Sequence, residues 1–333
     1  MSGGADSTAA MPPMMYGTAW KKDRTADLVY EAIKAGFRGI DTAAMKRHYD
    51  EALTGEGICR AISEGIVSRK DLFIQTKFTP NDDSLPNRDA PIPSQIHTSL
   101  AASLSNLSTP DHQTTTATTT PYLDAVLLHA PYPNPADTLV AWQTLQLYLP
   151  SSPDPSRAGK VLQLGLSNVT LPILTLLVSS SAPSPPPTII QNRFYSKGTG
   201  PAAAAAAAAA AVATGEAEEE EEEDRYDAAV RAWCKQHGAK YQGFWTLTGN
   251  ARVWRNEGFV RELAEGAGIS RAAAWYVLLM DEGVVVLNGT GDIGGHMRED
   301  LEAWGRVEAW RAAGNEAAWQ RCWTGFRRLL RSG

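Results

Sequence analysis

Eight short apolar runs recur along the chain, and amphipathic or loop-like stretches separate each run from the next. Apolar runs bounded by turn residues are typical of parallel strands buried on both faces. Their alternation with helical patterns favours repeated β–α units. The sequence therefore predicts an α/β fold, a closed (β/α)8 TIM barrel in one domain of 333 residues. The predicted strands are residues 14–20, 37–43, 72–78, 123–130, 161–169, 188–194, 240–246 and 283–287.

Three segments of biased composition interrupt this alternation. Residues 108–120 are rich in Ser and Thr, residues 180–187 in Pro and Ser, and residues 201–224 hold ten consecutive alanines followed by an acidic block. None of them can bury much apolar surface, so we expect low-complexity loop insertions. The last segment, residues 296–333, is Trp-rich and amphipathic and is expected to be helical and to pack on the barrel.

Charge and cysteine content exclude several classes of function. The formal charge of −6 comes from the acidic block at 216–224, and the remaining acidic and basic residues nearly balance. Lys and Arg are scattered, so no nucleic-acid partner is expected. Three widely spaced cysteines without a CxxC pair favour a reduced compartment. No run is long enough to span a membrane, and the start of the chain lacks a basic and apolar leader. We expect a soluble, cytoplasmic protein without a metal site.

Four polar residues lie at or just beyond the ends of the second, third and fourth predicted strands. They are Asp41, Tyr49, Lys77 and His129. In a barrel, the carboxyl ends of the strands carry the chemistry. A phenol with a pKa near ~10 donates a proton poorly unless a cation stabilises its phenolate. Lys77 can be that cation, Asp41 can hold the lysine, and His129 can hydrogen-bond a substrate carbonyl.

Taken singly, each of the four residues has an ordinary structural explanation. Asp41 could be a turn residue, Tyr49 a core aromatic, Lys77 a surface charge with a buried stem, and His129 a hydrogen-bonded core histidine. Their combination favours proton transfer, and the set is suited to protonating an oxygen while a hydride reaches the adjacent carbon.

The segments that carry these residues resemble the aldo-keto reductases, whose barrels reduce carbonyls with NADPH. The similarity lies in GFRGIDTA followed by HYDE, in DLFIQTK and in LDAVLLHA, and it continues through GKVLQLGLSNV and IIQNRF. QTKFTP, LLHAPYP and YQGFWTLTGN are most similar to a fungal subgroup of that family. The resemblance implies a catalytic tetrad of Asp41, Tyr49, Lys77 and His129, with Tyr49 as general acid.

The resemblance also implies a nicotinamide cofactor, NADPH with NADH as an alternative, and a small carbonyl substrate. Ser167, Asn168 and Gln191 would hold the carboxamide, and either Phe244 or Trp245 would stack on the nicotinamide ring. Substrate would meet Trp20, Tyr49 and His129. The remaining residues implied to bind the cofactor are Gly17, Thr18, Asp41, Leu247, Asn288, Gly289, Thr290, His296 and Arg298.

Two segments depart from the family pattern. Tyr49 follows Asp41 by eight residues, about three more than in most members, so residues 44–48 must bulge. The sequence leaves open whether Tyr49 or His48 points into the site. In the last strand, Asn288, Gly289 and Thr290 replace the usual Lys-Ser pair, and His296 falls near the position of an Arg that clamps the 2′-phosphate. Arg298 could replace that Arg. A guanidinium group binds phosphate better than the neutral imidazole of His296 does.

Gly289, Gly291 and Gly294 form a GxGxxG pattern between a strand and a helix. That pattern alone would predict a Rossmann fold. Downstream of it only helical sequence follows, so we expect these glycines to form the phosphate loop of the eighth β–α unit.

The sequence thus predicts an NAD(P)H-dependent reductase of an aldehyde or ketone. The alternative is a barrel that kept the cofactor pocket but lost turnover and acts as a regulatory or binding protein. The long tyrosine loop and the altered phosphate segment motivate that alternative. The physiological substrate and the oligomeric state are not specified by the sequence.

Overall fold

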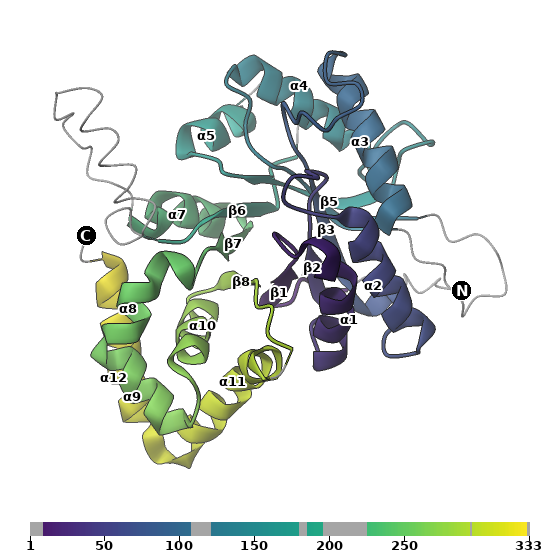
Figure 1. Cartoon of the computed structure of the whole chain (residues 1–333). Coiled ribbons are helices and arrows are strands. Elements are labelled where there is room, and N and C mark those ends of the chain that lie inside the picture. Colours follow the sequence, from purple (N-terminus) through teal and green to yellow (C-terminus); the bar gives the residue numbers. More distant parts are fainter. Residues whose placement is uncertain (1–8, 108–120, 180–184, 196–224, 294, 332–333) are drawn as a thin grey trace, which may run out of the picture.

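The fold was obtained as a computed structural model, which describes residues 9–107, 121–179, 185–195, 225–293 and 295–331. Eight parallel strands pair in sequence order and close into a barrel, as predicted (Figure 1). The strands are β1 (Met14–Gly17), β2 (Gly39–Asp41), β3 (Phe73–Phe78), β4 (Leu123–Leu128), β5 (Val161–Ser167), β6 (Ile189–Arg193), β7 (Lys240–Phe244) and β8 (Val284–Asn288).

Each predicted apolar run overlaps one of these strands, and the observed strands are shorter except for β8, which extends one residue beyond its run, to Asn288. β3 and β4 are buried over their whole length, because one face meets the barrel interior and the other meets the surrounding helices. The register places Asp41 opposite Gln75 and Gln191 opposite Gln242. Asp41 is the last residue of β2, whereas Gln75, Gln191 and Gln242 lie in the middle of β3, β6 and β7.

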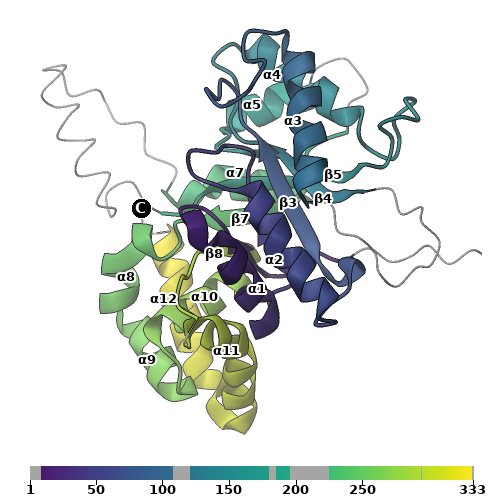
Figure 2. The same cartoon turned by 45° about the vertical axis from the view of Figure 1, so that its right-hand side comes forward.

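Helices surround the barrel and cover its outer face (Figures 1 and 2). The first of them, α1, buries Leu28, Val29 and Ile33 and ends before Gly36, whose φ of 123° suits a residue without a Cβ. The helices that follow the first six strands are α1 (Thr25–Ala35), α2 (Glu51–Ser63), α3 (Ile92–Leu107), α4 (Pro135–Gln146), α5 (Leu171–Ser179) and α7 (Ala228–His237).

The last third of the chain is mostly helical, and its helices gather on one side of the barrel (Figure 1). β7 is followed by α8 (Ala251–Asn256), α9 (Gly258–Ala267) and α10 (Arg271–Asp281), and β8 by α11 (His296–Trp310). A π-helical turn, Arg311–Asn315, joins α11 to α12 (Glu316–Arg331). α12 packs along α9 and buries Trp319, Cys322 and Phe326.

The predicted insertions at 108–120 and 201–224 lie outside the described residues, as do 180–184 of the third one. Residues 185–187 are described and are neither helix nor strand. The barrel is therefore built entirely from the segments between the insertions. Its strand ends and the loops that follow them surround one cavity.

Candidate active site

A cavity of about 930 Å³ opens at the carboxyl ends of the strands. A barrel enzyme binds its substrate there, because the loops that vary between proteins lie on that face. Fourteen of the predicted site residues line this cavity: Gly17, Trp20, Asp41, Tyr49, His129, Ser167, Asn168, Gln191, Phe244, Trp245, Leu247, Gly289, Thr290 and His296.

A buried ion pair forms the floor of the cavity. Lys77 Nζ lies 2.6 Å from Asp41 Oδ2 and 2.7 Å from Oδ1, and it also donates to the carbonyl oxygen of Thr42 at 2.8 Å. Both side chains are almost completely buried. Burial lowers the pKa of Lys77, and the Asp41 carboxylate opposes that change. Asp41 lines the cavity, whereas Lys77 lies beneath the lining residues.

The long loop after Asp41 folds back on itself and returns Tyr49 to this ion pair. Pairing with β3 continues to the backbone N–H of Ala44, which donates to the carbonyl oxygen of Lys77 at 3.1 Å. A tight turn follows, in which His48 and Tyr49 both donate their N–H to the Met45 carbonyl oxygen. Asp50 then caps α2 by accepting from Leu53 N at 2.9 Å. The extra residues are taken up in that turn.

The ring of Tyr49 lies between Lys77 and His129. Lys77 Nζ is 5.3 Å from the centroid of the Tyr49 ring, and the His129 ring meets it edge-on with centroids 6.0 Å apart. His48 also lines the cavity, but its ring packs against Trp20 at the mouth, with centroids 4.0 Å apart. Tyr49 is therefore the residue of the two that meets the buried cation.

Burial sets the protonation of both rings. It raises the pKa of the Tyr49 phenol, and the Asp41 charge raises it further, so the phenol carries its proton at neutral pH. Burial, together with smaller effects of Lys77 and His48, lowers the pKa of His129 to about 3, so the imidazole is neutral. Thr79 Oγ1 lies 2.7 Å from His129 Nδ1. When the hydroxyl donates to Nδ1, the proton of the ring resides on Nε2.

Three polar side chains line the cavity where the carboxamide site was predicted, Ser167 and Asn168 at the end of β5 and Gln191 in the middle of β6. Asn168 donates from Nδ2 to the His129 carbonyl oxygen at 2.9 Å and to Ser167 Oγ at 3.1 Å. Its φ of 53° is left-handed, which Asn tolerates well. Gln191 donates from Nε2 to Asp41 Oδ1 at 3.1 Å, which orients its amide.

Phe244, the last residue of β7, and Trp245 after it both line the cavity, and their rings stand at 85° to each other. A flat ligand ring can therefore lie parallel to one of them but not to both. Trp245 is 46% exposed, and the Arg193 guanidinium lies 5.1 Å from its ring centroid. Both aromatic faces remain candidates for stacking.

Four of the predicted site residues do not line this cavity. Lys77 lies beneath it, and Thr18 is buried, with its hydroxyl donating to the Asp41 carbonyl oxygen. Asn288 is also buried and donates to Asp300 Oδ2 at 2.7 Å. Arg298 lines a second, smaller cavity beside α1 and α11, because two positions along α11 place it on another face of the helix than His296. Arg298 therefore does not share the cavity that His296 lines.

Several cavity residues were not predicted from the sequence. Lys21 donates from Nζ to the carbonyl oxygens of Gly289 and Thr290, which draws the loop after β1 onto the loop after β8. Nothing in the sequence around Lys21 distinguishes it from a surface lysine. The other additions include Arg193, Thr246, Trp254, Arg271, Tyr276, Glu299 and Asp300.

Two further observations concern the described part of the chain. It contains no group of three or more His, Cys, Asp or Glu side chains arranged to hold a metal ion. None of its helices is both long enough and apolar enough to cross a membrane.

Residues 13–196 match the model of the aldo/keto reductase family. Aldo-keto reductase AKR2E4 of Bombyx mori is 34% identical over 175 residues, which is 50% of this chain and 48% of that protein. NAD(P)H-dependent D-xylose reductase I,II of the fungus Candida tropicalis is 28% identical over 211 residues, 56% of each protein. The chain thus spans about half the length of these curated relatives.

The solved structures extend the likeness in fold over most of the chain. The crystal structure of Bombyx mori AKR2E4 in complex with NADP aligns with 90% of this chain and 89% of that one, with a TM-score of 0.60 and 22% identity. The match of the family model covers more than half of the sequence and includes the strands that carry Asp41, Lys77 and His129. The chain belongs to the aldo/keto reductase family.

Proposed function

We propose that this protein is an oxidoreductase that reduces an aldehyde or ketone to an alcohol with NAD(P)H, and that Tyr49 is its general acid. The observation that carries the proposal is the buried Asp41–Lys77 pair beneath Tyr49, with His129 beside it and a large cavity above. The names of the relatives support the cofactor, since the Candida tropicalis protein is an NAD(P)H-dependent reductase.

The cavity residues fit a nicotinamide dinucleotide. Both protons of the Gln191 amide nitrogen are used, on Asp41 and on Gln242, so its carbonyl oxygen is left to accept from a carboxamide N–H₂. Asn168 and Ser167 would take the other side of that group. Phe244 or Trp245 would lie against the ring. The volume is within the range of cofactor sites. A bound reduced nicotinamide would supply a hydride to the carbonyl carbon of the substrate.

The protein's own residues would handle the proton. Tyr49 would give its phenolic proton to the carbonyl oxygen as the new C–H bond forms. The phenolate left behind would be stabilised by the Lys77 cation, which Asp41 keeps charged and oriented. His129, neutral and bonded through Nδ1 to Thr79, would donate from Nε2 to the same carbonyl oxygen. Trp20, which is 63% exposed at the mouth, would contact apolar parts of the substrate.

NADPH oxidation with a panel of aldehydes, by the wild type and by Tyr49→Phe, tests the proposal. We expect the variant to bind cofactor as the wild type does and to lose at least ~100-fold in turnover, because only the proton donor is removed. If the wild type binds NADPH but turns over no faster than Tyr49→Phe, the enzyme proposal is wrong. The regulatory or binding role would then be the better explanation.

We propose NADPH as the cofactor, with NADH as the weaker alternative. Lys21, Arg271 and His296 are basic residues that line the cavity together with Gly289 and Thr290 of the loop after β8, whereas Arg298 lines another cavity. Fluorescence titration of both cofactors tests this. We expect NADPH to bind more tightly, His296→Ala to reduce that difference, and the control Arg298→Ala to leave it unchanged. A loss of discrimination in Arg298→Ala alone would contradict the proposal.

A further inference from the structure

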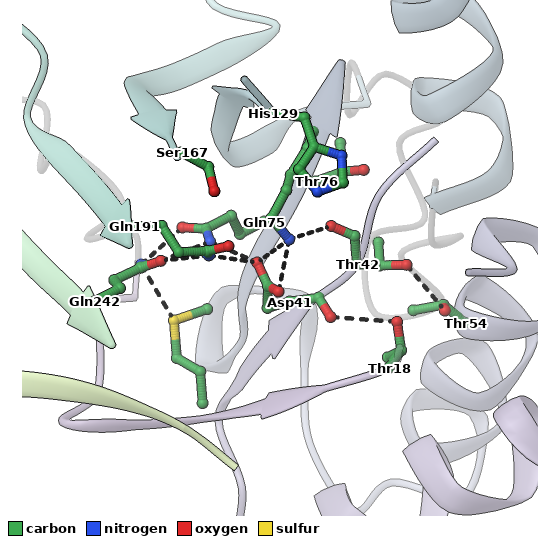
Figure 3. Close-up of polar contacts among 12 residues, drawn as sticks. Thr18, Asp41, Thr42, Thr54, Gln75, Thr76, His129, Ser167, Gln191 and Gln242 are labelled. Carbon is green, nitrogen blue, oxygen red and sulfur yellow. Dashed lines mark hydrogen bonds and ion pairs between the residues drawn. The ribbon is translucent and has the colours of Figure 1, made fainter. Parts of the chain in front are cut away.

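Three glutamines and one aspartate share a buried layer of the barrel (Figure 3). Asp41 lies on β2, Gln75 on β3, Gln191 on β6 and Gln242 on β7, and each is at most 3% exposed. The strand register pairs Asp41 with Gln75 and Gln191 with Gln242. Hydrogen bonds then join the two pairs across the barrel interior.

The orientation of each amide in this layer is chemically determined. A carboxylate only accepts hydrogen bonds, so Gln75 and Gln191 must present their nitrogens to Asp41 Oδ1, at 2.6 and 3.1 Å. The same two nitrogens donate to Gln242 Oε1, at 2.9 and 2.8 Å. Gln242 Nε2 donates in return to Gln75 Oε1 at 2.8 Å. No member can rotate without breaking a bond to another.

Stability alone does not explain such a layer. The interior of a TIM barrel is usually filled by branched apolar side chains. A buried amide loses its hydrogen bonds to water and must replace them with hydrogen bonds inside the protein. Apolar residues of similar volume would stabilise the fold at least as well. What the amides add is direction, because apolar side chains could not orient Asp41 or Gln191.

Asp41 and Gln191 are the two members that reach the proposed chemistry. Asp41 holds Lys77 beneath Tyr49, and Gln191 lines the cavity where the carboxamide of the cofactor would lie. Gln75 and Gln242 are absent from the cavity lining, and the side-chain hydrogen bonds seen for them among the described residues go to the other members of the layer and to two methionine sulfurs.

We propose that Gln75 and Gln242 are positioning residues that tie Asp41 and Gln191 into one rigid unit. Gln242 fixes the Gln191 amide with its carbonyl oxygen available to the nicotinamide carboxamide, and Gln75 fixes both Gln242 and the Asp41 carboxylate. The position of the nicotinamide ring is thereby fixed relative to Asp41, the carboxylate that holds Lys77. This inference rests on the proposed cofactor but concerns residues that do not touch it.

Gln242→Met and Gln75→Met remove the amides while keeping the side-chain length. Gln163→Met is the control, because Gln163 lies half-buried on β5 and takes no part in the hydrogen bonds described above for this layer. The dissociation constants of two ligands would be measured by fluorescence for each protein. NADPH carries the carboxamide, whereas 2′-phospho-ADP-ribose carries the rest of the molecule without the nicotinamide. The second ligand separates a positioning defect from general damage to the cavity.

We expect Gln242→Met to weaken NADPH binding about tenfold, the loss of one hydrogen-bonding group, and to change 2′-phospho-ADP-ribose binding less than about twofold. Gln75→Met should show the same split, and Gln163→Met neither change. If Gln75→Met does not fold, because it also removes a donor from Asp41, Gln242→Met carries the test. The inference is overturned if NADPH binding is unchanged or if both ligands weaken equally. Failure of the wild type to bind either ligand would instead overturn the proposed function.

Discussion

At the scale of single residues, His129 shows how burial controls the chemistry of a side chain. Its pKa is lowered to about 3 by burial and by the Lys77 and His48 charges, whereas an unfolded histidine titrates near ~6.5. Between these values the unfolded chain binds more protons than the folded one. The stability that comes from the neutral imidazole is therefore fully present above the unfolded pKa and is lost as pH falls below it.

This linkage makes a quantitative prediction for the free energy of unfolding. Between pH 7.5 and pH 5.5 the wild type should lose roughly 1.4 kcal/mol more than His129→Gln, because only the histidine gains a proton on unfolding. Urea unfolding at both pH values measures the difference. His237→Gln, at an exposed position, serves as the control and should keep the wild-type dependence. Equal slopes in the wild type and His129→Gln would show that His129 is not held neutral.

At the scale of elements, α2 places the tyrosine loop. The helix begins two residues after Tyr49, and its buried Glu51 accepts hydrogen bonds from Thr76 on β3 and Ser103 on α3. Burial raises the pKa of this carboxyl, while the hydrogen bonds oppose that change. The close approach of α2 to α3 depends on Gly55, where a Cβ would lie 1.9 Å from the Asn106 carbonyl oxygen.

We therefore expect opposite effects from the same substitution at two helical glycines. Gly55→Ala should destabilise the protein by about 1–3 kcal/mol, because backbone must move to admit the methyl group. Gly305→Ala, in α11 with open space around it, should stabilise by about 0.5–1 kcal/mol. Denaturant unfolding of both variants measures this, and a change of the same sign in the two would contradict the packing argument.

At the scale of the whole molecule, the C-terminal helix stabilises the barrel at a distance from the site. Phe326 of α12 is fully buried and packs edge-on against Trp275 of α10, with centroids 5.3 Å apart. The Trp275 indole N–H donates at 2.9 Å to the carbonyl oxygen of Thr246, a cavity residue. Packing at the end of the chain is thus connected to the loop after β7.

Phe326→Ala should cost about 3–5 kcal/mol of unfolding free energy, the usual range for a deleted core phenyl ring. Thr324→Ala, exposed on the same helix, should change it little. Thermal and urea unfolding would measure both. A loss below about 1 kcal/mol in Phe326→Ala would mean that α12 is not part of the cooperative core.

The sequence predicted the barrel because its evidence is local. Seven of the eight apolar runs contain their strand, the eighth misses only Asn288, and Asp41, Lys77 and His129 lie near the ends of their runs. The ends of the strands were predicted less well. Loop residues such as Thr18 and Thr42 are buried like strand residues, so the predicted runs continue beyond the last residues of β1 and β2. Arg298 was predicted to be an alternative phosphate ligand near His296, but two positions along α11 put the two residues on different faces of the helix, and they line different cavities.

What the sequence determined by itself was therefore the order of the strands and the residue type at the end of each. Only the tertiary structure decided that the turn at Met45 brings Tyr49 over Lys77, that Lys21 joins two loops, and that Gln75 meets Gln242. The physical reason is that periodicity reveals which face of an element is buried. The partner of a buried polar group depends on closing the barrel, which brings together residues more than a hundred positions apart.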